Sequence, residues 1–276
     1  MTWTQRQHAM LAEMGTPLWF GPRPEGTAAE AATTPAAPVA SQVVAVPRPP
    51  VMPPPLLQPT GARGAVRPEG VSRMMWPELR DAVTQCTACG LCKSRTQPVF
   101  GVGHPNAHWM IIGEAPGEQE DRQGEPFVGK SGQLLDNMLR AIGLSRGPIP
   151  AAPHPDGTTQ EAVNDPERQV FIANTLKCRP PGNRNPEPEE LAQCEPYLLR
   201  QIELVQPKII VAMGRFAIQS LLRTSEPIGK LRGGVHQFQG VPLIVTYHPA
   251  YLLRNLQEKS KAWDDLCLAR ITRMGV

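Results

Sequence analysis

The chain has 276 residues, with 28 Lys and Arg against 25 Asp and Glu, and a formal net charge of +3. Residues 1–75 contain 13 of the 32 prolines and no Lys or Asp, and the rest of the chain carries 22 basic and 21 acidic side chains. Such a balance excludes a globally basic clamp, so any nucleic-acid contact must come from local groups.

The N-terminal part of the chain has low complexity. A stretch such as TTPAAPVASQVVAVPRPPVMPPPLLQPTGARG cannot bury enough apolar area to offset its ordering entropy. We therefore expect a disordered linker over residues 21–73 and one compact domain over residues 74–276. MTWTQRQHAM lacks the apolar core of a signal peptide, and no apolar run reaches the ~18 residues of a membrane span. These features predict a cytoplasmic protein with no membrane attachment.

Four cysteines come in two remote pairs. Cys86 and Cys89 form C-x2-C, and Cys178 and Cys194 lie much later in the chain. In a reducing compartment they indicate a metal centre or free thiols rather than disulfides, and four thiolates can close around one centre. Buried unpaired cysteines are the simpler alternative. Zinc competes with iron, although the second pair is not the short C-x2-C that zinc sites often use.

Two further cysteines fit less well. Cys92 extends the first pair to C-x2-C-x2-C, part of a ferredoxin-like run, but no fourth Cys followed by Pro comes soon after. We therefore expect Cys92 and Cys267 not to be ligands.

Secondary structure alternates between strands and helices. Four continuous apolar runs predict strands covered on both faces, as in a parallel sheet. Capped periodic segments between and after them predict helices. The result is an α/β fold with a central four-stranded parallel sheet. Residues 145–169 read as a flexible surface insertion. The strands are expected at WMII (109–112), VFIA (170–173), IIVAM (209–213) and LIVTY (243–247), and the helices at 131–143, 186–205, 215–222 and 259–273.

Polar or glycine-rich segments follow all four predicted strands, where ligands collect in such sheets. One of them, MIIGEAPGEQED (110–121), is acidic, with carboxylates at Glu114, Glu118, Glu120 and Asp121. A phosphate would be repelled by this turn, so a different ligand is expected there.

Six motifs in register resemble those of the family 4 uracil-DNA glycosylases over roughly residues 76–273. The resemblance implies a three-layer α/β/α sandwich, a [4Fe-4S] cluster on the four paired cysteines (with structural zinc as the alternative), and excision of uracil from single- or double-stranded DNA. The motifs are C-T-x-C-x-L, G-E-A-P-G-E-x-E-D, G-x-P-F-V-G-x-S-G-x-L-L, N-T-x-K-C-R-P-P, the distant Cys194 and H-P-x-Y-L-L-R-N.

Base excision requires flipping the base, holding it and stabilising the departing anion. Phe127 is the candidate stacking ring. Asn174 ends the second predicted strand, and its amide can donate to uracil O4 and accept from N3–H. His248 follows the fourth strand and can donate to uracil O2 as charge develops there.

The acidic turn supplies the remaining uracil contacts: Glu114 and the backbone of Ala115 and Pro116. Better-known uracil-DNA glycosylases have an aspartate where this chain has Ala115. Water activation is therefore open between Glu114 and Glu120, with Asn183 a weaker candidate. Glu118 and Asp121 are interpreted as structural caps or solvated charges.

DNA contacts are expected beside the pocket. Leu252 and Leu253 can wedge into the space that a flipped base leaves, while Arg254 meets phosphate. Alternatively, the leucines are buried in the first turn of a helix, or each does one of these jobs. The other candidate phosphate contacts are Lys177, Arg179, Arg184, Lys230 and Arg232.

Two other functions remain open. A related type traps uracil-DNA covalently through a histidine, but the corresponding segment KCRPPGNRNPEPEE has none. A non-catalytic Fe-S module that binds DNA or a partner is the second.

The first 20 residues have a pattern of their own. Met10, Leu11 and Met14 fall on one predicted helix, followed by Leu18 and Trp19. This resembles the N-terminal peptide of the bacterial polymerase psi subunit, which implies that residues 4–20 contact the clamp loader; folding back on the domain is the alternative. We expect a monomer in the bacterial cytoplasm, associated with the nucleoid.

Overall fold

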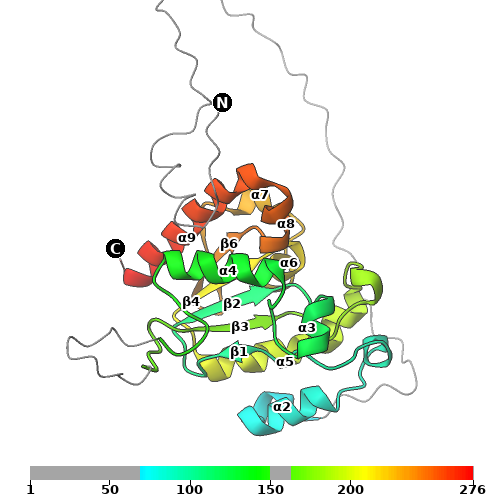
Figure 1. Cartoon of the computed structure of the whole chain (residues 1–276). Helices are drawn as coiled ribbons and strands as arrows, with labels where there is room; N and C mark the ends of the chain where they lie inside the picture. Colours follow the sequence, from blue (N-terminus) through cyan, green and yellow to red (C-terminus); the bar gives the residue numbers. More distant parts are fainter. Residues whose placement is uncertain (1–68, 150–162, 276) are drawn as a thin grey trace, which may run out of the picture. The chain divides into compact units, whose positions relative to one another are not determined.

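A computed structural model describes residues 69–149 and 163–275. At its centre lies a six-stranded sheet with the order β1-β3-β2-β4-β6-β5 (Figure 1). The four inner strands are parallel, and three of them are buried at every residue, as their continuous apolar runs predict. The strands are β1 (Val102–Gly103), β2 (Trp109–Gly113), β3 (Val170–Asn174), β4 (Ile209–Met213), β5 (Val235–Phe238) and β6 (Val241–Thr246).

The predicted four parallel strands are confirmed at the centre of the sheet, but the sheet has six strands rather than four. Antiparallel pairing adds β1 beside β3 and β5 beside β6, so the sheet is mixed. β5 alternates exposed and half-buried residues, and β1 has only two residues, so neither shows an apolar run. Gln239 and Gly240 connect β5 to β6 with φ values of 49° and 83°, the positive values that a two-residue hairpin turn needs.

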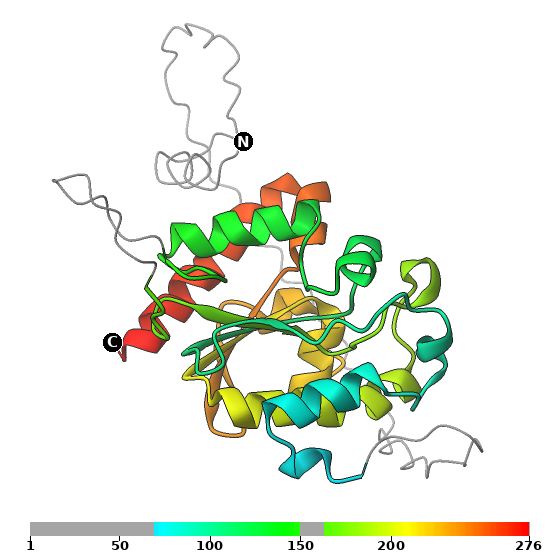
Figure 2. The same cartoon turned by 60° about the horizontal axis from the view of Figure 1, so that its bottom comes forward.

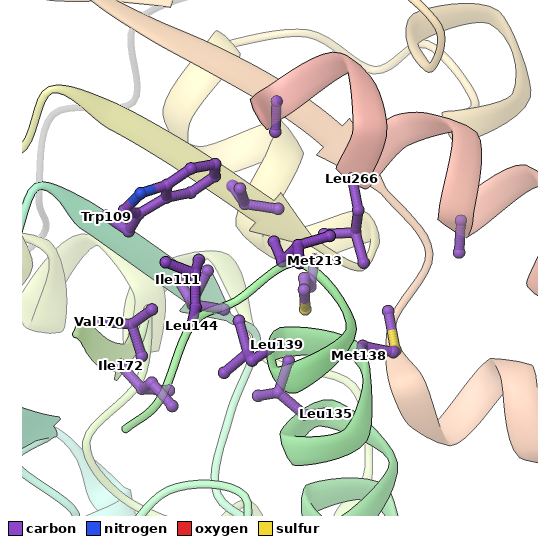
Figure 3. Close-up of a cluster of buried hydrophobic side chains, with 14 of the residues drawn as sticks. Trp109, Ile111, Leu135, Met138, Leu139, Leu144, Val170, Ile172, Met213 and Leu266 are labelled. Carbon is purple, nitrogen blue, oxygen red and sulfur yellow. The ribbon is translucent and has the colours of Figure 1, made fainter. Parts of the chain in front are cut away.

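Helices cover both faces of the sheet, which makes a three-layer α/β/α arrangement (Figures 1 and 2). On one face, α4 and α9 pack on strand residues such as Ile111 and Ile172, with Leu135 and Met138 among the buried side chains (Figure 3). α8 lies next to α4. These helices are α4 (Lys130–Ala141), α8 (Pro249–Arg254) and α9 (Lys259–Met274).

The opposite face is covered by α5 and α6. Alternate strand residues, including Met110 and Ile112, pack here with Ile202 and Leu221. A third cluster joins α2 to α5 through Leu79 and Tyr197 and includes the cysteine segments. These helices are α2 (Trp76–Thr84), α5 (Pro188–Val205) and α6 (Arg215–Leu222). The four predicted helices are confirmed as α4, α5, α6 and α9, whereas α2 was not predicted.

Short helices complete the domain. The turn η1 places Val71 in the third cluster, so the packed domain includes residues before the expected boundary at 74. The short elements are η1 (Val71–Arg73), η2 (Gly90–Lys93), α3 (Glu118–Gln123), η3 (Pro181–Asn183), α7 (Ile228–Leu231) and η4 (Leu256–Glu258). Across the two described stretches, no helix is both long and apolar enough to span a bilayer.

The predicted insertion at 145–169 has structured ends. Ser145 pairs with Gln169 and Ile149 with Val163 in isolated bridges. The described ends of this segment are therefore tied to each other and to β3 rather than forming a flexible loop. Residues 150–162 lie outside the described part, as do the proposed peptide 4–20 and the linker up to residue 68.

Candidate active site

A cleft of about 830 Å³ opens at the carboxyl ends of the parallel strands. Each inner strand is followed by a residue of its wall: Glu114 after β2, Asn174 at the end of β3, Gly214 after β4 and His248 after β6. Ala115, Pro116 and Phe127 also line it. The structure thus gathers in one cleft every residue predicted from the sequence to bind uracil.

Asn174 presents an amide with spare hydrogen-bonding capacity. The residue is 2% exposed, and within the described part of the chain its Oδ1 atom has no hydrogen-bond partner. Buried polar atoms are normally paired, and leaving one unpaired costs about 1–3 kcal/mol. An unpaired acceptor in a cleft wall is therefore suited to a ligand N–H group.

His248 is held as a neutral donor. Its Nδ1 accepts a hydrogen bond from the Ala250 N–H at 3.1 Å, which leaves the proton of the neutral ring on Nε2. Burial lowers the pKa of His248 to about 4, despite an opposing effect of the Glu120 carboxylate. At neutral pH the ring can therefore donate one hydrogen bond without carrying a charge.

Glu114 follows β2, and its carboxyl group lies next to the first residues of α6. Burial raises the pKa of its carboxyl group, while the Phe216 N–H and the Arg215 guanidinium act in the opposite direction. Its backbone carbonyl accepts a hydrogen bond from the Leu176 N–H at 3.1 Å, which joins the acidic turn to the segment after β3.

The other carboxylates of the turn are engaged in local hydrogen bonds and an ion pair. Glu120 accepts hydrogen bonds from the N–H groups of Gly117 and Val128, at 3.1 and 3.0 Å. The single Thr96 N–H is shared between both carboxylate oxygens of Asp121, at 2.9 and 3.0 Å, and Glu118 pairs with Arg122. All three lie in the first turn of α3, where carboxylates complement the helix dipole and cap N–H groups. The acidity of the turn is thus explained mainly by a helix that the sequence patterns did not predict.

Phe127 is clamped by a residue that the motifs did not single out. Its backbone has a φ of 55°, in the left-handed region that residues with a β-carbon rarely adopt. The Arg146 guanidinium donates to the carbonyls of Pro126 and Phe127, both at 3.0 Å, and to Asp136 at 2.7 Å. Phe127 in turn stacks on His248, with ring centroids 5.2 Å apart. In the sequence, the only signal for this role was an arginine soon after the predicted helix 131–143.

Two of the predicted DNA contacts are buried. Lys177 is 1% exposed and donates to the Asn174 carbonyl at 2.8 Å and to Gln201 at 2.6 Å, so it supports the end of β3 and cannot reach phosphate. Leu252 is 0% exposed in the core beside α4, whereas Leu253 is 40% exposed. The helical turn that contains the pair therefore gives the two leucines different environments.

The predicted phosphate contacts differ in whether their side chains are already bound to another residue of the protein. Arg179 donates to Asn183 at 2.8 Å, Arg184 binds Glu190, and Arg232 binds the buried Asp265. Lys230 and Arg254 are exposed, and among the described residues no ion pair involves either. Arg254 also lines the cleft.

Five cysteines share one small cavity apart from the cleft. Cys86, Cys89, Cys178 and Cys194 line it together with Cys92. Burial raises the pKa of Cys89 to about 11 and that of Cys194 to about 12. Hydrogen bonds reach two of the sulfurs: Arg95 donates to Cys178 at 3.0 Å and the Lys177 N–H to Cys194 at 3.2 Å.

The fold and the cleft define an α/β/α protein with a cleft suited to a ligand at the carboxyl ends of its parallel strands, and comparison with known proteins gives its family. The family model of the uracil DNA glycosylase superfamily matches residues 100–267. A type-4 uracil-DNA glycosylase of Archaeoglobus fulgidus is 38% identical over 191 residues, 66% of this chain and 85% of that protein. Those of Sulfurisphaera tokodaii and Thermotoga maritima are 41% and 40% identical over 64% of this chain, and over 76% and 82% of their own lengths.

The chain belongs to the uracil-DNA glycosylase superfamily and, within it, to the type-4 uracil-DNA glycosylases. It is an enzyme of DNA repair that excises uracil by hydrolysing an N-glycosyl bond.

Proposed function

We propose that the protein flips uracil out of DNA into the cleft, hydrolyses its N-glycosidic bond and leaves an abasic site in an uncut strand. The unpaired, buried Oδ1 atom of Asn174 carries this proposal. It can accept the uracil N3–H while Nδ2 donates to O4, a pattern that cytosine reverses at both positions.

Departure of the base needs stabilisation of negative charge at uracil O2. The neutral ring of His248 can donate its Nε2–H to that atom. Loss of one such donor typically raises a barrier by ~3 kcal/mol. With O2 hydrogen-bonded, the uracil anion can leave without a general acid.

The sugar becomes cationic as the base leaves, and Glu114 is the carboxylate that can stabilise it. The side chains of Glu114 and His248 both lie close to Gly214. A Cβ atom built on Gly214 would be 3.6 Å from Glu114 Oε2 and 3.3 Å from His248 Cβ. We propose that Glu114 also orients the water, because both Glu120 oxygens already accept backbone N–H groups. Ala115 and Pro116 would contact uracil through their backbone.

Phe127 is the proposed stacking ring. In the structure His248 lies against it with an angle of 25° between the ring planes. The contacts of Arg146 keep the Phe127 backbone in place beside His248.

DNA would lie across the mouth of the cleft. We propose Leu253 as the wedge that fills the space left by uracil, with Arg254 on a neighbouring phosphate. Arg179 and Arg184 are further contacts, provided by a loop that already orders them through Asn183 and Glu190. The substrate is uracil-containing DNA, single- or double-stranded.

The cysteine cavity suits an iron–sulfur cluster. The side chains of all four proposed ligands line one shared cavity. Thiolates as buried as those of Cys178 and Cys194 are unfavourable without cations, and the hydrogen bonds that these two sulfurs accept from Arg95 and from the Lys177 N–H suit ligating sulfurs. We propose a [4Fe-4S] cluster on Cys86, Cys89, Cys178 and Cys194, which would hold the two cysteine segments together. Structural zinc is the alternative.

Three proposals rest on the sequence alone. The protein would act as a monomer in the bacterial cytoplasm, on nucleoid DNA, and residues 4–20 would contact the clamp loader. Pull-down of clamp-loader subunits with a peptide of residues 1–20, against the same peptide with Leu18 and Trp19 replaced by alanine, tests the last of these.

One assay tests the catalytic proposal. Wild-type protein is incubated with a uracil-containing oligonucleotide, and free uracil, strand breaks and denaturation-resistant adducts are measured. Repeated turnover of uracil with an uncut strand is expected, and Asn174→Ala should abolish most of it. A stoichiometric covalent adduct, or unchanged release by Asn174→Ala, would overturn the proposal.

A further inference from the structure

Two tyrosines form a second aromatic surface in the cleft. Tyr247, at the end of β6, and Tyr251, in α8, both line the cleft and stack on each other with centroids 5.0 Å apart and planes at 28°. They flank His248 in the chain on either side. This pair takes no part in the uracil contacts described above, although it lines the same cleft as Asn174.

The inner ring of the pair is fixed. Tyr247 packs against the core cluster of α4 and α9, and the Arg232 guanidinium lies 5.8 Å from its ring centroid. A hydrogen bond to Glu258 holds its hydroxyl group, and burial, the largest effect, raises its pKa. Tyr247 is therefore a rigid base on which another ring can rest.

The outer ring is exposed. Tyr251 is 37% exposed, and because one of its faces rests on Tyr247, the exposure belongs to the other face and the edge. Arg254, one helical turn further along α8, is exposed, lines the same cleft and has no ion pair among the residues described. An aromatic face with an unpaired cation beside it is the arrangement with which proteins bind single-stranded nucleic acid.

We propose that Tyr251 is a stacking subsite for the unpaired base next to the uracil on the same strand, with Arg254 near the intervening phosphate. The inference rests on the proposed binding of uracil at Asn174. Every base has a π face, so this subsite tolerates any sequence. It acts mainly on single-stranded DNA, since a neighbour within a duplex is already stacked and paired.

The test is a double-mutant cycle in which the Tyr251 ring and the neighbouring base are removed separately and together. Single-stranded oligonucleotides carry uracil and, on its 5′ or 3′ side, either a normal base or a tetrahydrofuran residue that lacks a base. Wild-type protein and Tyr251→Ala are compared by kcat/KM for uracil release. With both bases present, the variant should lose about 5- to 100-fold. On the oligonucleotide that lacks the stacked neighbour, wild type and variant should differ by less than about twofold.

Further variants separate stacking from folding. Tyr251→Phe should restore most of the loss, and Leu256→Ala, an exposed apolar residue of η4 outside the cleft wall, should match wild type. Equal losses on all oligonucleotides, whichever neighbour lacks its base, would overturn the subsite and indicate a structural tyrosine. No loss on any of them would overturn it as well. Uracil release by wild type on the unmodified strand reports the proposed function separately.

Discussion

Asn174 lies opposite Gly113 across the β2–β3 pair, and a Cβ atom on Gly113 would lie 2.4 Å from the Asn174 side-chain oxygen. The same Cβ would lie 2.6 Å from Cζ of Phe127. Because both distances are far shorter than van der Waals contact, only glycine lets the two side chains share this corner of the cleft. The proposed edge reader and the proposed stacking ring are therefore positioned by one backbone site.

The chemistry at that corner predicts a change of base. Asn174→Asp loses the donor for uracil O4, so uracil kcat/KM should fall by about 100-fold or more. A carboxylate can accept from the cytosine amino group and, when protonated, donate to N3, so cytosine excision should appear. Release of both bases from matched oligonucleotides measures this. Asn185→Asp, in the same cleft, is the control and should excise only uracil. Full uracil activity and no cytosine activity in Asn174→Asp would contradict the assignment.

The pH dependence follows from two opposite pKa shifts. Burial raises the pKa of Glu114, so this carboxylate takes up a proton at a higher pH than an ordinary glutamate does. Once protonated, it can no longer stabilise the sugar cation. The pKa of His248 is lowered to about 4, so the ring stays neutral until well below pH 6. The first acid limb of kcat/KM should therefore belong to Glu114.

The matched variants distinguish the two groups. Glu114→Gln should be slow but should keep its residual rate until His248 takes up a proton near pH 4. A limb near pH 6.5 that disappears in His248→Asn would show an unshifted histidine instead.

Arg146 provides a prediction that the motifs did not suggest. Arg146→Gln removes two donors from the carbonyls of Pro126 and Phe127, so the strained Phe127 backbone can relax and misplace the ring. We expect kcat/KM to fall by about 10- to 100-fold, because displacements near 1 Å have effects of that size. Arg146→Lys should recover part of it. Arg140→Gln, which removes only a contact with Asn137, should leave kinetics and thermal melting unchanged. If Arg146→Gln lowers the melting temperature but not kcat/KM, the clamp is only structural.

Sequence patterns captured the core better than the edges and the second layer of the site. Buried parallel strands leave continuous apolar runs, so β2, β3 and β4 were predictable, whereas β5 alternates and β1 is too short. The lining of the cleft was predictable because strand ends converge there. Burial of Lys177 was not, because its ammonium is satisfied by the distant Gln201, a pairing that no local pattern reveals. Arg146 is similar, since its carbonyl partners lie before α4 in the chain.

The two adjacent leucines of α8 should respond oppositely. Leu252→Ala leaves a cavity in the core and should cost about 2–5 kcal/mol of unfolding free energy. Leu253→Ala should change stability by less than about 0.5 kcal/mol, yet slow excision from duplex DNA more than from single strands, since only a duplex leaves a gap to fill. Chemical denaturation and excision on both substrates measure the two effects. Equal slowing on both substrates by Leu253→Ala would contradict the wedge.

Cys92 provides a control for the proposed ligand set of the cysteine cavity. Cys92 lines the same cavity as the four proposed ligands, but we expect it not to be a ligand, because no fourth Cys followed by Pro comes soon after it. Anaerobically purified wild type should contain iron and sulfide and absorb visible light, and Cys92→Ser should do the same. Cys194→Ser should lose the proposed cluster and unfold more readily, because that cluster would join the segment at Cys86 to α5, which contains Cys194.

Metal analysis decides between the outcomes. A colourless wild-type protein with one zinc would replace the cluster by a structural zinc site without affecting the glycosylase assignment. If Cys92→Ser lost iron while Cys194→Ser kept it, the ligand set itself would be wrong, and the buried Cys194 thiol, with its pKa raised to about 12, would be an ordinary core cysteine.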